Sequence, residues 1–376
     1  MIGVAAFVFF SLLTGTAVQE RLLHQDAKPF VVHSSLWSTS SYWDRKPSHK
    51  YFRVLALDGG GVRGIIQLVA LQHLERLTGK PISELFDGFI ATSVGSATCV
   101  MLLIPDYRGK PMYTTDDVMR MVFDQTQLQR VFSQTPFRLL MTANGAFGPR
   151  YSGKSKAELL QQRFKDTPYN HLLKPVVITS WSTETLKPHF LANWTHKGYE
   201  DWPVWAIVHG ATSPPGYFPP THVTDFSREG VTLKMDLNDG GVYVNTPITP
   251  VLLDMFTQHL KKDQQLLIVN IGTGFAKDPY PFRKTQKWGM LSWFSPLFNS
   301  MGTLSGRLAY EQLKALTTQW GDKYRVFVIN TPVDPRDMSL DDIRAKHLQR
   351  LKHYGKQMVD MHAQSFQTLA ELLRET

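Results

Sequence analysis

Two short turns within residues 51–101 constrain the fold of this 376-residue chain more than any other feature. The first, DGGGVRG (residues 58–64), follows the β-branched and aromatic segment YFRVLAL and precedes IIQLVALQHLERLTG, whose apolar residues recur at helical spacing. The second, IATSVGSA (residues 90–97), follows LFDGFI and precedes the apolar segment ATCVMLLI. Periodicity and turn residues therefore predict two successive strand–turn–helix units in an α/β domain.

Both turns place polar groups at a helix N-terminus, where unpaired backbone N–H groups and the helix dipole favour negative charge. In the second turn, Ser93 lies between small residues in the sequence ATSVG, which is similar to a nucleophile elbow that exposes a serine hydroxyl. In the first turn, successive glycines let backbone N–H groups approach a substrate oxygen closely. A serine nucleophile requires such donors for the oxyanion of its tetrahedral intermediate, so the two turns together indicate a serine hydrolase.

The first turn also matches the dinucleotide fingerprint G-x-G-x-x-G through Gly59, Gly61 and Gly64. A nucleotide site of that class requires an acidic residue about 20 residues further on, which binds a ribose. Glu84 and Asp87 precede the second predicted strand, and that strand ends in the serine turn instead. The sequence therefore favours a hydrolase over a nucleotide-binding oxidoreductase.

Four motifs in this order make the chain resemble the patatin-like phospholipases. They are DGGGVRG with its TSVG elbow, HGATSPPGYFPP (residues 209–220), DGGVYVNTP (residues 239–247) and IVNIGTG (residues 268–274). The resemblance continues to YRVFVINTPVD and LDD, so it covers residues 51–361. Ala91 in the first elbow position and Thr246, where the family often has asparagine, depart from the pattern. The resemblance implies a three-layer α/β fold with a central, mostly parallel sheet flanked by helices.

The family uses a Ser-Asp dyad, so the resemblance implies that Ser93 attacks an ester carbonyl and that Asp239 takes and returns its proton. The oxyanion hole and its support would be formed by Gly59, Gly60, Gly61, Arg63 and Val94. The expected activity is phospholipase A-like hydrolysis of fatty acyl esters through an acyl-enzyme, with no cofactor and no metal.

Two other hypotheses remain open beside the dyad. A Ser-Asp-His hydrolase would add a histidine after Asp239 in chain order, such as His259, which lies in a predicted helix at residues 248–260 without a turn signal. A catalytically inactive lipid-binding homologue would keep the pocket without turnover. Labelling by a fluorophosphonate distinguishes an enzyme from such a homologue.

The formal net charge of +9 predicts a surface that attracts anions. Because the lysines are scattered rather than arranged with aromatic stacking motifs, the sequence favours an anionic lipid surface over a nucleic acid. Residues 279–305 combine basic side chains with aromatic ones such as Trp288 and Trp293. They are interpreted either as a flap that covers the core or as an edge that contacts membranes. The single cysteine, Cys99, excludes an internal disulfide and is predicted to lie in the core.

Four regions are expected along the chain: an apolar segment at residues 1–17, an irregular polar leader at 18–50, the patatin-like catalytic domain at 51–361, and a C-terminal helical extension at 362–376. Residues 2–13 have the length of a signal-peptide core and are followed by small residues, although no Lys or Arg precedes them. We expect secretion or export with peripheral membrane association. The alternatives are an uncleaved anchor, a buried N-terminal element and a cytoplasmic location.

Within the domain, the pattern predicts one surface helix over residues 114–132 and a long loop over residues 136–152. It predicts strands at residues 175–183, at 266–272 and directly before Asp239. Helices are expected at residues 155–163, 202–212 and 304–320, and over most of the chain after residue 340. Asn193-Trp194-Thr195 is a glycosylation sequon, which matters only in a eukaryotic secretory pathway.

Overall fold

The computed structural model describes residues 30–32, 42–43, 49–145, 148–195, 197–228, 231–277, 280–320 and 323–374. The apolar segment at residues 1–17 and most of the polar leader lie outside this range, so the signal peptide stays a prediction. No helix in the described part of the chain is long and apolar enough to cross a bilayer.

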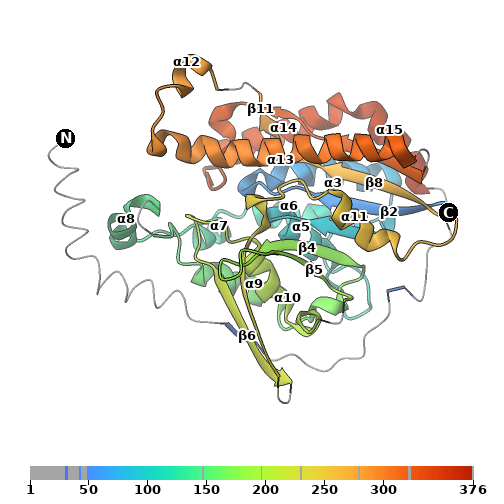
Figure 1. Ribbon diagram of the computed structural model, residues 1–376, viewed down its shortest axis with the longest axis horizontal. Helices are drawn as coiled ribbons and strands as arrows, with labels where there is room; N and C mark the ends of the chain where they lie inside the picture. Colours follow the sequence, from blue (N-terminus) through green and yellow to red (C-terminus); the bar gives the residue numbers. More distant parts are fainter. Residues whose placement is uncertain are drawn as a thin grey trace.

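A mostly parallel sheet forms the middle layer of the molecule (Figure 1). Its strands are β1 (Phe30–Val32), β2 (Tyr51–Leu57), β3 (Gly88–Ala91), β4 (Val176–Trp181), β5 (Pro188–Ala192), β6 (Thr221–Arg228), β7 (Val231–Asp239), β8 (Gln265–Ile271) and β10 (Tyr324–Ile329). Among the described strands the order is β1-β6-β7-β4-β3-β2-β8-β10, with β5 also paired to β4. The central pairs β4-β3, β3-β2, β2-β8 and β8-β10 are parallel, whereas β5 and β7 run antiparallel to β4. The predicted strands before Ser93, Asp239 and residue 272 are confirmed.

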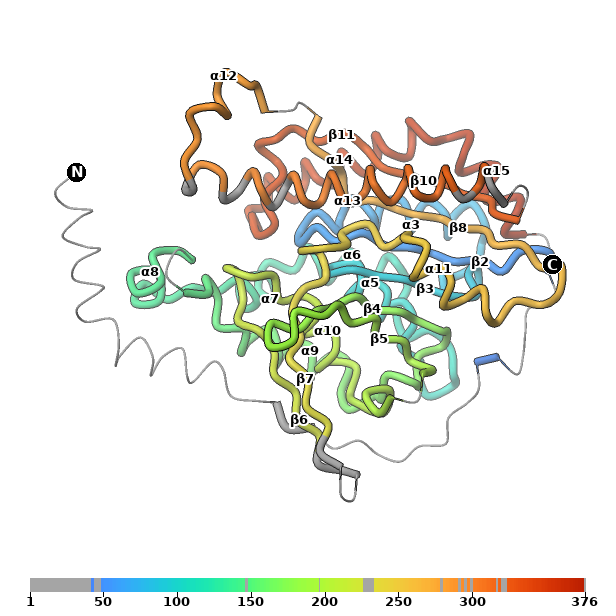
Figure 2. Tube along the Cα trace, viewed as in Figure 1, coloured from blue at the N-terminus to red at the C-terminus, as the bar shows by residue number. Residues whose placement is uncertain are grey.

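Helices cover both faces of this sheet. The helices of the described chain are α3 (Gly64–Thr78), α4 (Ile82–Leu85), α5 (Val94–Leu103), α6 (Thr115–Val122), α7 (Gln125–Val131), α8 (Pro136–Thr142), α9 (Lys154–Phe164), α10 (Val204–Ala211), α11 (Pro250–Thr257), α12 (Phe282–Thr285), α13 (Met290–Trp320), α14 (Ala345–Met361) and α15 (Ala363–Arg374). Two short strands, β9 (Phe275–Ala276) and β11 (Pro332–Val333), form a separate parallel pair. The antiparallel pair β6–β7 extends away from the body of the molecule (Figure 2).

The strand β2 shows how the three layers are held together. Successive side chains of a strand point to opposite faces, and Leu55 and Leu57 belong to the larger core with α3, α5, α10, α14 and α15. Val54 and Ala56 belong to a second core with α11 and α13. All four side chains are fully buried, which explains why this strand is a nearly continuous apolar run. The predicted three-layer α/β fold is therefore confirmed.

Other parts of the chain complete the larger core. Cys99 is fully buried in it, as predicted. The helix α15 packs on α3, and its Phe366 is fully buried in the same core. The Arg53 guanidinium, on β2, donates to the carbonyl oxygens of Leu372 and Leu373 at 3.0 and 3.1 Å. Residues after 361 thus share the core of the catalytic domain.

Two sequence predictions between the elbow and β4 were wrong. The single helix expected over residues 114–132 is two helices, α6 and α7, because the Asp124 side chain accepts hydrogen bonds from Thr126 N and Gln127 N and caps a new helix. The long loop expected over residues 136–152 contains α8, which begins with Pro136 after the capping residue Thr135.

The helix predicted over residues 304–320 is the second half of a longer one. The helix α13 begins at Met290 and contains Pro296. Most of the aromatic and basic segment at residues 279–305 is therefore helical, in α12 and the first half of α13. In Figure 1, α12 lies beyond the N-terminal end of α13, at the periphery of the molecule.

Candidate active site

Ser93 lies between the end of β3 and the start of α5 in a backbone conformation that residues other than glycine rarely adopt. Its φ is 52° and its ψ is −126°, and the residue is 9% exposed. Gly95 allows α5 to approach β2, because a Cβ at this position would lie 2.5 Å from the carbonyl oxygen of Leu57. Ala91, which departs from the family pattern, is fully buried in the larger core. The geometry is that of a nucleophile elbow.

Asp239 is the last residue of β7 and faces Ser93. Ser93 Oγ donates a hydrogen bond to Asp239 Oδ2 at 2.5 Å. The Gly241 backbone N–H donates to Asp239 Oδ1 at 2.8 Å, and the Trp181 indole N–H donates to the Asp239 carbonyl oxygen at 3.0 Å. Ser93 and Asp239 are 146 positions apart in the sequence, and the structure brings these two predicted site residues into contact.

Burial raises the pKa of Asp239 to about 6, because the charged carboxylate loses its hydration. Hydrogen bonds from Ser93 and Gly241 and the positive charge of Lys156 act in the opposite direction. At neutral pH the carboxylate is ionised, and it is a stronger base than an aspartate with the ordinary pKa of 3.8. Such a carboxylate can accept a proton directly from the hydroxyl that it contacts.

The glycine turn offers unpaired donors beside Ser93. Among the described residues, the backbone N–H groups of Gly60, Gly61 and Val94 have no hydrogen-bond partner. The Gly59 N–H is different, since it donates to the carbonyl oxygen of Asn245 at 3.0 Å. Gly59 instead provides space, because a Cβ there would lie 3.1 Å from the Ser93 Cβ. The backbone N–H groups of Gly60, Gly61 and Val94 are thus available as donors, whereas that of Gly59 is not.

The direction of these N–H groups is set by the carbonyl at the other end of each peptide unit, because the trans peptide is planar. Thr273 Oγ1 donates to the carbonyl oxygen of Gly59 at 2.5 Å and so orients the Gly60 N–H. Arg63 Nε donates to the carbonyl oxygen of Gly60 at 3.3 Å and so orients the Gly61 N–H. Burial lowers the pKa of this arginine to about 10, so it is charged at neutral pH. Arg63 thus contacts the glycine turn through its own side chain.

Thr246, the second departure from the family pattern, supports the glycine turn rather than the turn of Asp239. Its hydroxyl donates to Asp58 Oδ2 at 2.8 Å, and Asn270 Nδ2 donates to Asp58 Oδ1 at 2.7 Å. Burial raises the pKa of Asp58 to about 7. Both oxygens of this buried carboxyl group are therefore hydrogen-bonded where β2 ends.

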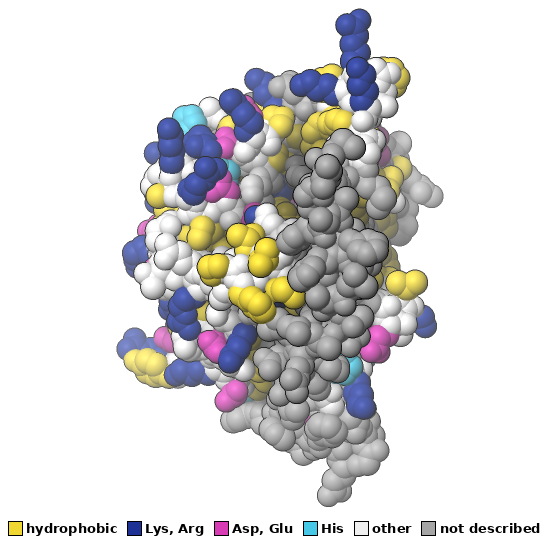
Figure 3. Space-filling view, turned by 90° about the vertical axis from the view of Figure 1, so that its left-hand side faces the viewer, with side chains coloured by type: hydrophobic (Ala, Val, Ile, Leu, Met, Phe, Trp, Pro, Cys, Tyr) yellow, Lys and Arg dark blue, Asp and Glu magenta, His cyan; other side chains and the backbone are white. Residues whose placement is uncertain are grey.

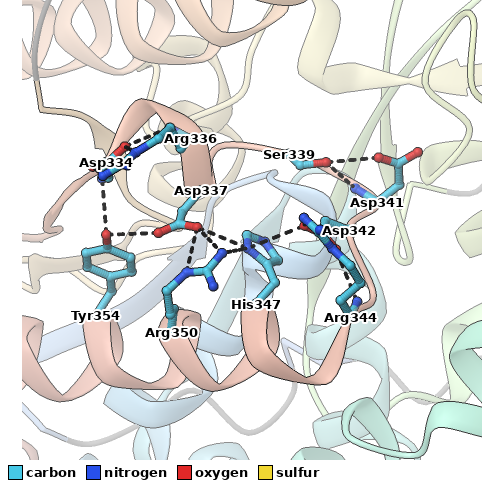
Figure 4. Close-up of polar contacts among 10 residues, drawn as sticks. All are labelled: Asp334, Arg336, Asp337, Ser339, Asp341, Asp342, Arg344, His347, Arg350 and Tyr354. Atoms are coloured by element: carbon cyan, nitrogen blue, oxygen red, sulfur yellow. Dashed lines mark hydrogen bonds and ion pairs between the residues drawn. The ribbon is translucent and has the colours of Figure 1, made fainter.

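The loop that precedes α14 holds the other side of the glycine turn. The Val62 N–H donates to the carbonyl oxygen of Leu340 at 2.9 Å, and this oxygen would lie 2.2 Å from a Cβ at position 61. Asp337, in the loop before Leu340, accepts hydrogen bonds from side chains of α14, namely His347, Arg350 and Tyr354, and so ties this loop to the helix (Figure 4). Asp341, just after Leu340, accepts a separate hydrogen bond from Ser339. Asp341 Oδ2 also accepts hydrogen bonds from Arg150 and Tyr151 at 2.6 and 2.7 Å. The position of the glycine turn thus depends on residues almost 300 positions later in the chain.

Ser93 and Asp239 line a cavity of about 260 Å³. Most of its walls are apolar side chains from α3, α5, α7, α9 and α10 and from the residue after α7, among them Leu68, Met101, Leu128, Phe132, Leu160 and Val208. These walls suit an alkyl chain. Lys156, which the sequence analysis did not single out, also lines the cavity.

The other predicted candidates lie elsewhere. His259 stacks on Trp43 with ring centroids 3.8 Å apart, and no histidine is among the described residues that line the cavity. Asp87 accepts hydrogen bonds from His49 and from the Arg53 backbone N–H before β3 begins, at the opposite end of that strand from Ser93. In the described part of the chain, no group of three or more His, Cys, Asp or Glu residues could hold a metal ion.

A three-layer α/β fold, a serine elbow and a facing aspartate define the class of the site. The model of the patatin-like phospholipase family matches residues 55–252, which is more than half of the chain. The chain belongs to the patatin-like phospholipase family, and the resemblance predicted from its motifs is confirmed.

Curated relatives agree with this assignment. Patatin-like protein 1 of Arabidopsis thaliana is 28% identical over 340 residues, 81% of each chain. Patatin-15 of Solanum tuberosum is 27% identical over 263 residues, 64% of this chain and 66% of that protein. Probable inactive patatin-3-Kuras 1, also of Solanum tuberosum, is 27% identical over 276 residues, 67% of this chain and 71% of that protein. The family supports lipid acyl hydrolysis as the general activity, and the third relative is named as a probable inactive patatin.

Proposed function

We propose that the protein is a phospholipase A-like hydrolase that releases ester-linked fatty acids from phospholipids or related lipids through a Ser93–Asp239 dyad. The observation that carries this proposal is the 2.5 Å hydrogen bond from Ser93 Oγ to Asp239 Oδ2 in the wall of a mostly apolar cavity. The cavity would hold the acyl chain, and the ester carbonyl would lie between Ser93 and the glycine turn.

In the acylation step, Ser93 Oγ forms a bond to the ester carbonyl carbon while its proton passes to Asp239 Oδ2. The carbonyl oxygen becomes an oxyanion, which accepts hydrogen bonds from the backbone N–H groups of Gly60, Gly61 and Val94. The bond to the alcohol oxygen then breaks, and Asp239 returns the proton to the leaving alkoxide. Water attacks the acyl-enzyme with the same proton transfers, which frees the fatty acid and restores Ser93.

A catalytically inactive homologue is the main alternative, since one relative carries that description in its name. The geometry favours an enzyme, because the hydroxyl, the carboxylate and three unpaired N–H groups are all present around one cavity. A Ser-Asp-His triad is less well supported, because His259 packs against Trp43 rather than beside Asp239.

Labelling with a fluorophosphonate, followed by peptide mapping, tests the proposal. We expect one labelled residue, Ser93, and no labelling or ester hydrolysis in Ser93→Ala. The matched control is Ser96→Ala, a buried serine one turn further along α5, which should label and hydrolyse as the wild type does. Labelling at another residue, or hydrolysis retained in Ser93→Ala, would contradict the assignment. An inactive homologue would fail to label at all.

We also propose peripheral docking on anionic lipid surfaces through α12 and the start of α13. Phe282 is 77% exposed and Trp293 is 39% exposed, and Arg283, Lys284 and Lys287 are exposed beside them. Gly302, further along α13, lines the cavity, so this helix leads from the exposed aromatic residues to the site. Figure 3 shows hydrophobic side chains on this side of the molecule with Lys and Arg side chains around them.

Vesicle assays distinguish such docking from a flap that merely covers the core. Hydrolysis of phosphatidylserine-containing vesicles should fall with added salt, because each basic residue near the surface contributes about 1 kcal/mol and screening acts within about 10 Å at about 0.1 M salt. The double variant Phe282→Ser, Trp293→Ser should bind vesicles less but cleave a soluble short-chain ester normally. Tyr107→Ser is the control. Tyr107 is 86% exposed and follows the C-terminal end of α5, whereas Ser93 lies at the N-terminal end of that helix. Equal loss on both substrates would indicate a flap.

Export remains a proposal that rests on the apolar segment at residues 1–17, in which residues 2–13 have the length and apolar character of a signal-peptide core. Sequencing the N-terminus of protein recovered from the medium of a secreting host tests it. A new N-terminus close to residue 18 supports cleavage, whereas retention in the cell with Met1 intact contradicts it.

A further inference from the structure

Lys156 is a buried cation in the wall of an otherwise mostly apolar cavity. The residue lies on α9, is 5% exposed, and lines the cavity together with Ser93 and Asp239. An ammonium group loses most of its hydration in such a place, so its position requires compensating contacts. Burial lowers the pKa of Lys156 to about 7, and the negative charge of Asp239 opposes this effect.

The compensating contacts come from the C-terminal end of α10 and the residues after it. Lys156 Nζ donates to the carbonyl oxygen of Thr212 and to Ser213 Oγ, both at 2.8 Å, and to the carbonyl oxygen of His209 at 3.1 Å. The ring of Phe218 lies 4.1 Å from Nζ. These partners engage all three donors of the ammonium group, so protonated Lys156 has no donor left for the substrate ester, and its positive charge is fully present only below its pKa of about 7.

Ser213, one of these partners of Lys156, also contacts Asp239, the proposed base. The Asp239 backbone N–H donates to the carbonyl oxygen of Ser213 at 3.2 Å, and Lys156 holds Ser213 through its hydroxyl. The positive charge of Lys156 also counters the effect of burial on the Asp239 carboxylate. Lys156 therefore affects Asp239 both through position and through charge.

Other titratable groups near this place act differently. Burial raises the pKa values of Tyr217 and Tyr243, so both phenols are neutral at neutral pH. Burial holds the pKa of His209 well below its ordinary value, so this imidazole is also neutral. Arg63 is charged, but it binds the carbonyl oxygen of Gly60 and interacts with Asp58.

We propose that Lys156 is a positioning residue for hydrolysis, whose buried charge keeps Asp239 ionised and whose hydrogen bonds hold the Thr212–Ser213 segment against it. This inference rests on the proposed dyad, since it assigns Lys156 a role through Asp239. A lysine that only caps α10 would contribute to folding and would leave the ionisation of Asp239 unchanged.

The rate of fluorophosphonate labelling as a function of pH tests the inference. In the wild type, labelling should fall as the pH drops through the pKa of Asp239. In Lys156→Met, this acidic limb should move to higher pH by about one unit, because a nearby positive charge that stabilised the carboxylate is lost. Lys156→Arg should keep the limb close to its wild-type position. Lys154→Met is the matched control, since it removes an exposed lysine from the same helix and should not move the limb.

Each outcome decides the question. If Lys156→Met is folded and its acidic limb coincides with that of the wild type, the inference is wrong. If Lys156→Met does not fold, Lys156→Gln carries the same comparison, because it keeps N–H donors for the carbonyl oxygens near α10. If both neutral variants fail to fold while Lys156→Arg folds, the lysine serves helix capping alone and the inference is overturned. Failure of the dyad itself is distinguishable, because labelling would then survive in Ser93→Ala or occur elsewhere.

Discussion

Replacing Asp239 by asparagine should abolish hydrolysis and, at neutral pH, make the protein more stable. Asparagine has the shape of aspartate, so contacts with Ser93 and Gly241 can persist, but it carries no charge to bury. The difference between the ordinary pKa of 3.8 and the buried pKa of about 6 corresponds to about 3 kcal/mol of unfolding free energy at pH 8, at about 1.36 kcal/mol per pH unit. The ionised base thus destabilises the fold that holds it.

The effect of Asp239 on the unfolding free energy depends on pH, and its sign follows from the raised pKa. Because the folded-state pKa is raised, the contribution of Asp239 to stability is fully present below about pH 4 and is lost as the pH rises through about 6. The stability of Asp239→Asn relative to the wild type should therefore increase by about 2 kcal/mol between about pH 4.5 and about pH 8.

Urea unfolding at several pH values, followed by tryptophan fluorescence, measures this difference. The matched control is Asp263→Asn, whose side chain is exposed on a loop, so that water solvates either form and the pH profile should follow the wild type. A difference between Asp239→Asn and the wild type that stays constant to within about 0.5 kcal/mol across this range would refute the reasoning from burial.

Three other changes probe the elbow, the excluded histidine and the glycine turn. Ser93→Gly should lack hydrolysis, as Ser93→Ala does, but should be more stable than Ser93→Ala by about 1 kcal/mol in urea unfolding, because glycine adopts a φ of 52° without strain. His259→Ala should keep ester hydrolysis within a few-fold and lower stability by about 1 kcal/mol, since it removes ring contacts with Trp43 and Trp194 and no contact with Asp239 is involved; a rate loss of about 10³ would restore the triad. Gly61→Ala should lower the hydrolysis rate by about 10² or more, because a Cβ 2.2 Å from the carbonyl oxygen of Leu340 displaces an oxyanion donor; a normal rate in a folded variant would exclude Gly61 from that role.

Local sequence patterns were sufficient for the parts of the site that depend on local conformation. The elbow at Ser93 and the strand that ends at Asp239 follow from strand periodicity and small residues, and both were predicted. The helix α8 was missed because glycines and aromatic residues near it outweighed the capping signals of Thr135 and Pro136. Local signals therefore existed even where the prediction was wrong.

The supporting contacts could not be predicted in this way. Thr273 and the glycine turn that it orients are 214 residues apart, and Lys156 reaches Ser213 across 57 residues. Thr273 belongs to the IVNIGTG motif, but that motif does not specify the glycine turn as its partner, and Lys156 belongs to none of the four motifs. Their roles follow from the order of strands in the sheet and from which helices meet at one cavity, which a local pattern does not specify.

The hydrogen bonds between Arg53 and α15 have a consequence for biosynthesis. The Arg53 guanidinium is buried, and its recorded acceptors Leu372 and Leu373 lie about 320 residues later. While the ribosome is still synthesising the middle of the chain, the Arg53 guanidinium lacks these two acceptors, and α15 does not yet pack on α3. Because the loop at Leu340 and the helix α15 follow most of the described chain, the glycine turn and the outer side of α3 gain these contacts only after α15 has been synthesised. A nascent chain that ends before these residues would therefore have an incompletely supported glycine turn, and we expect it to lack hydrolysis.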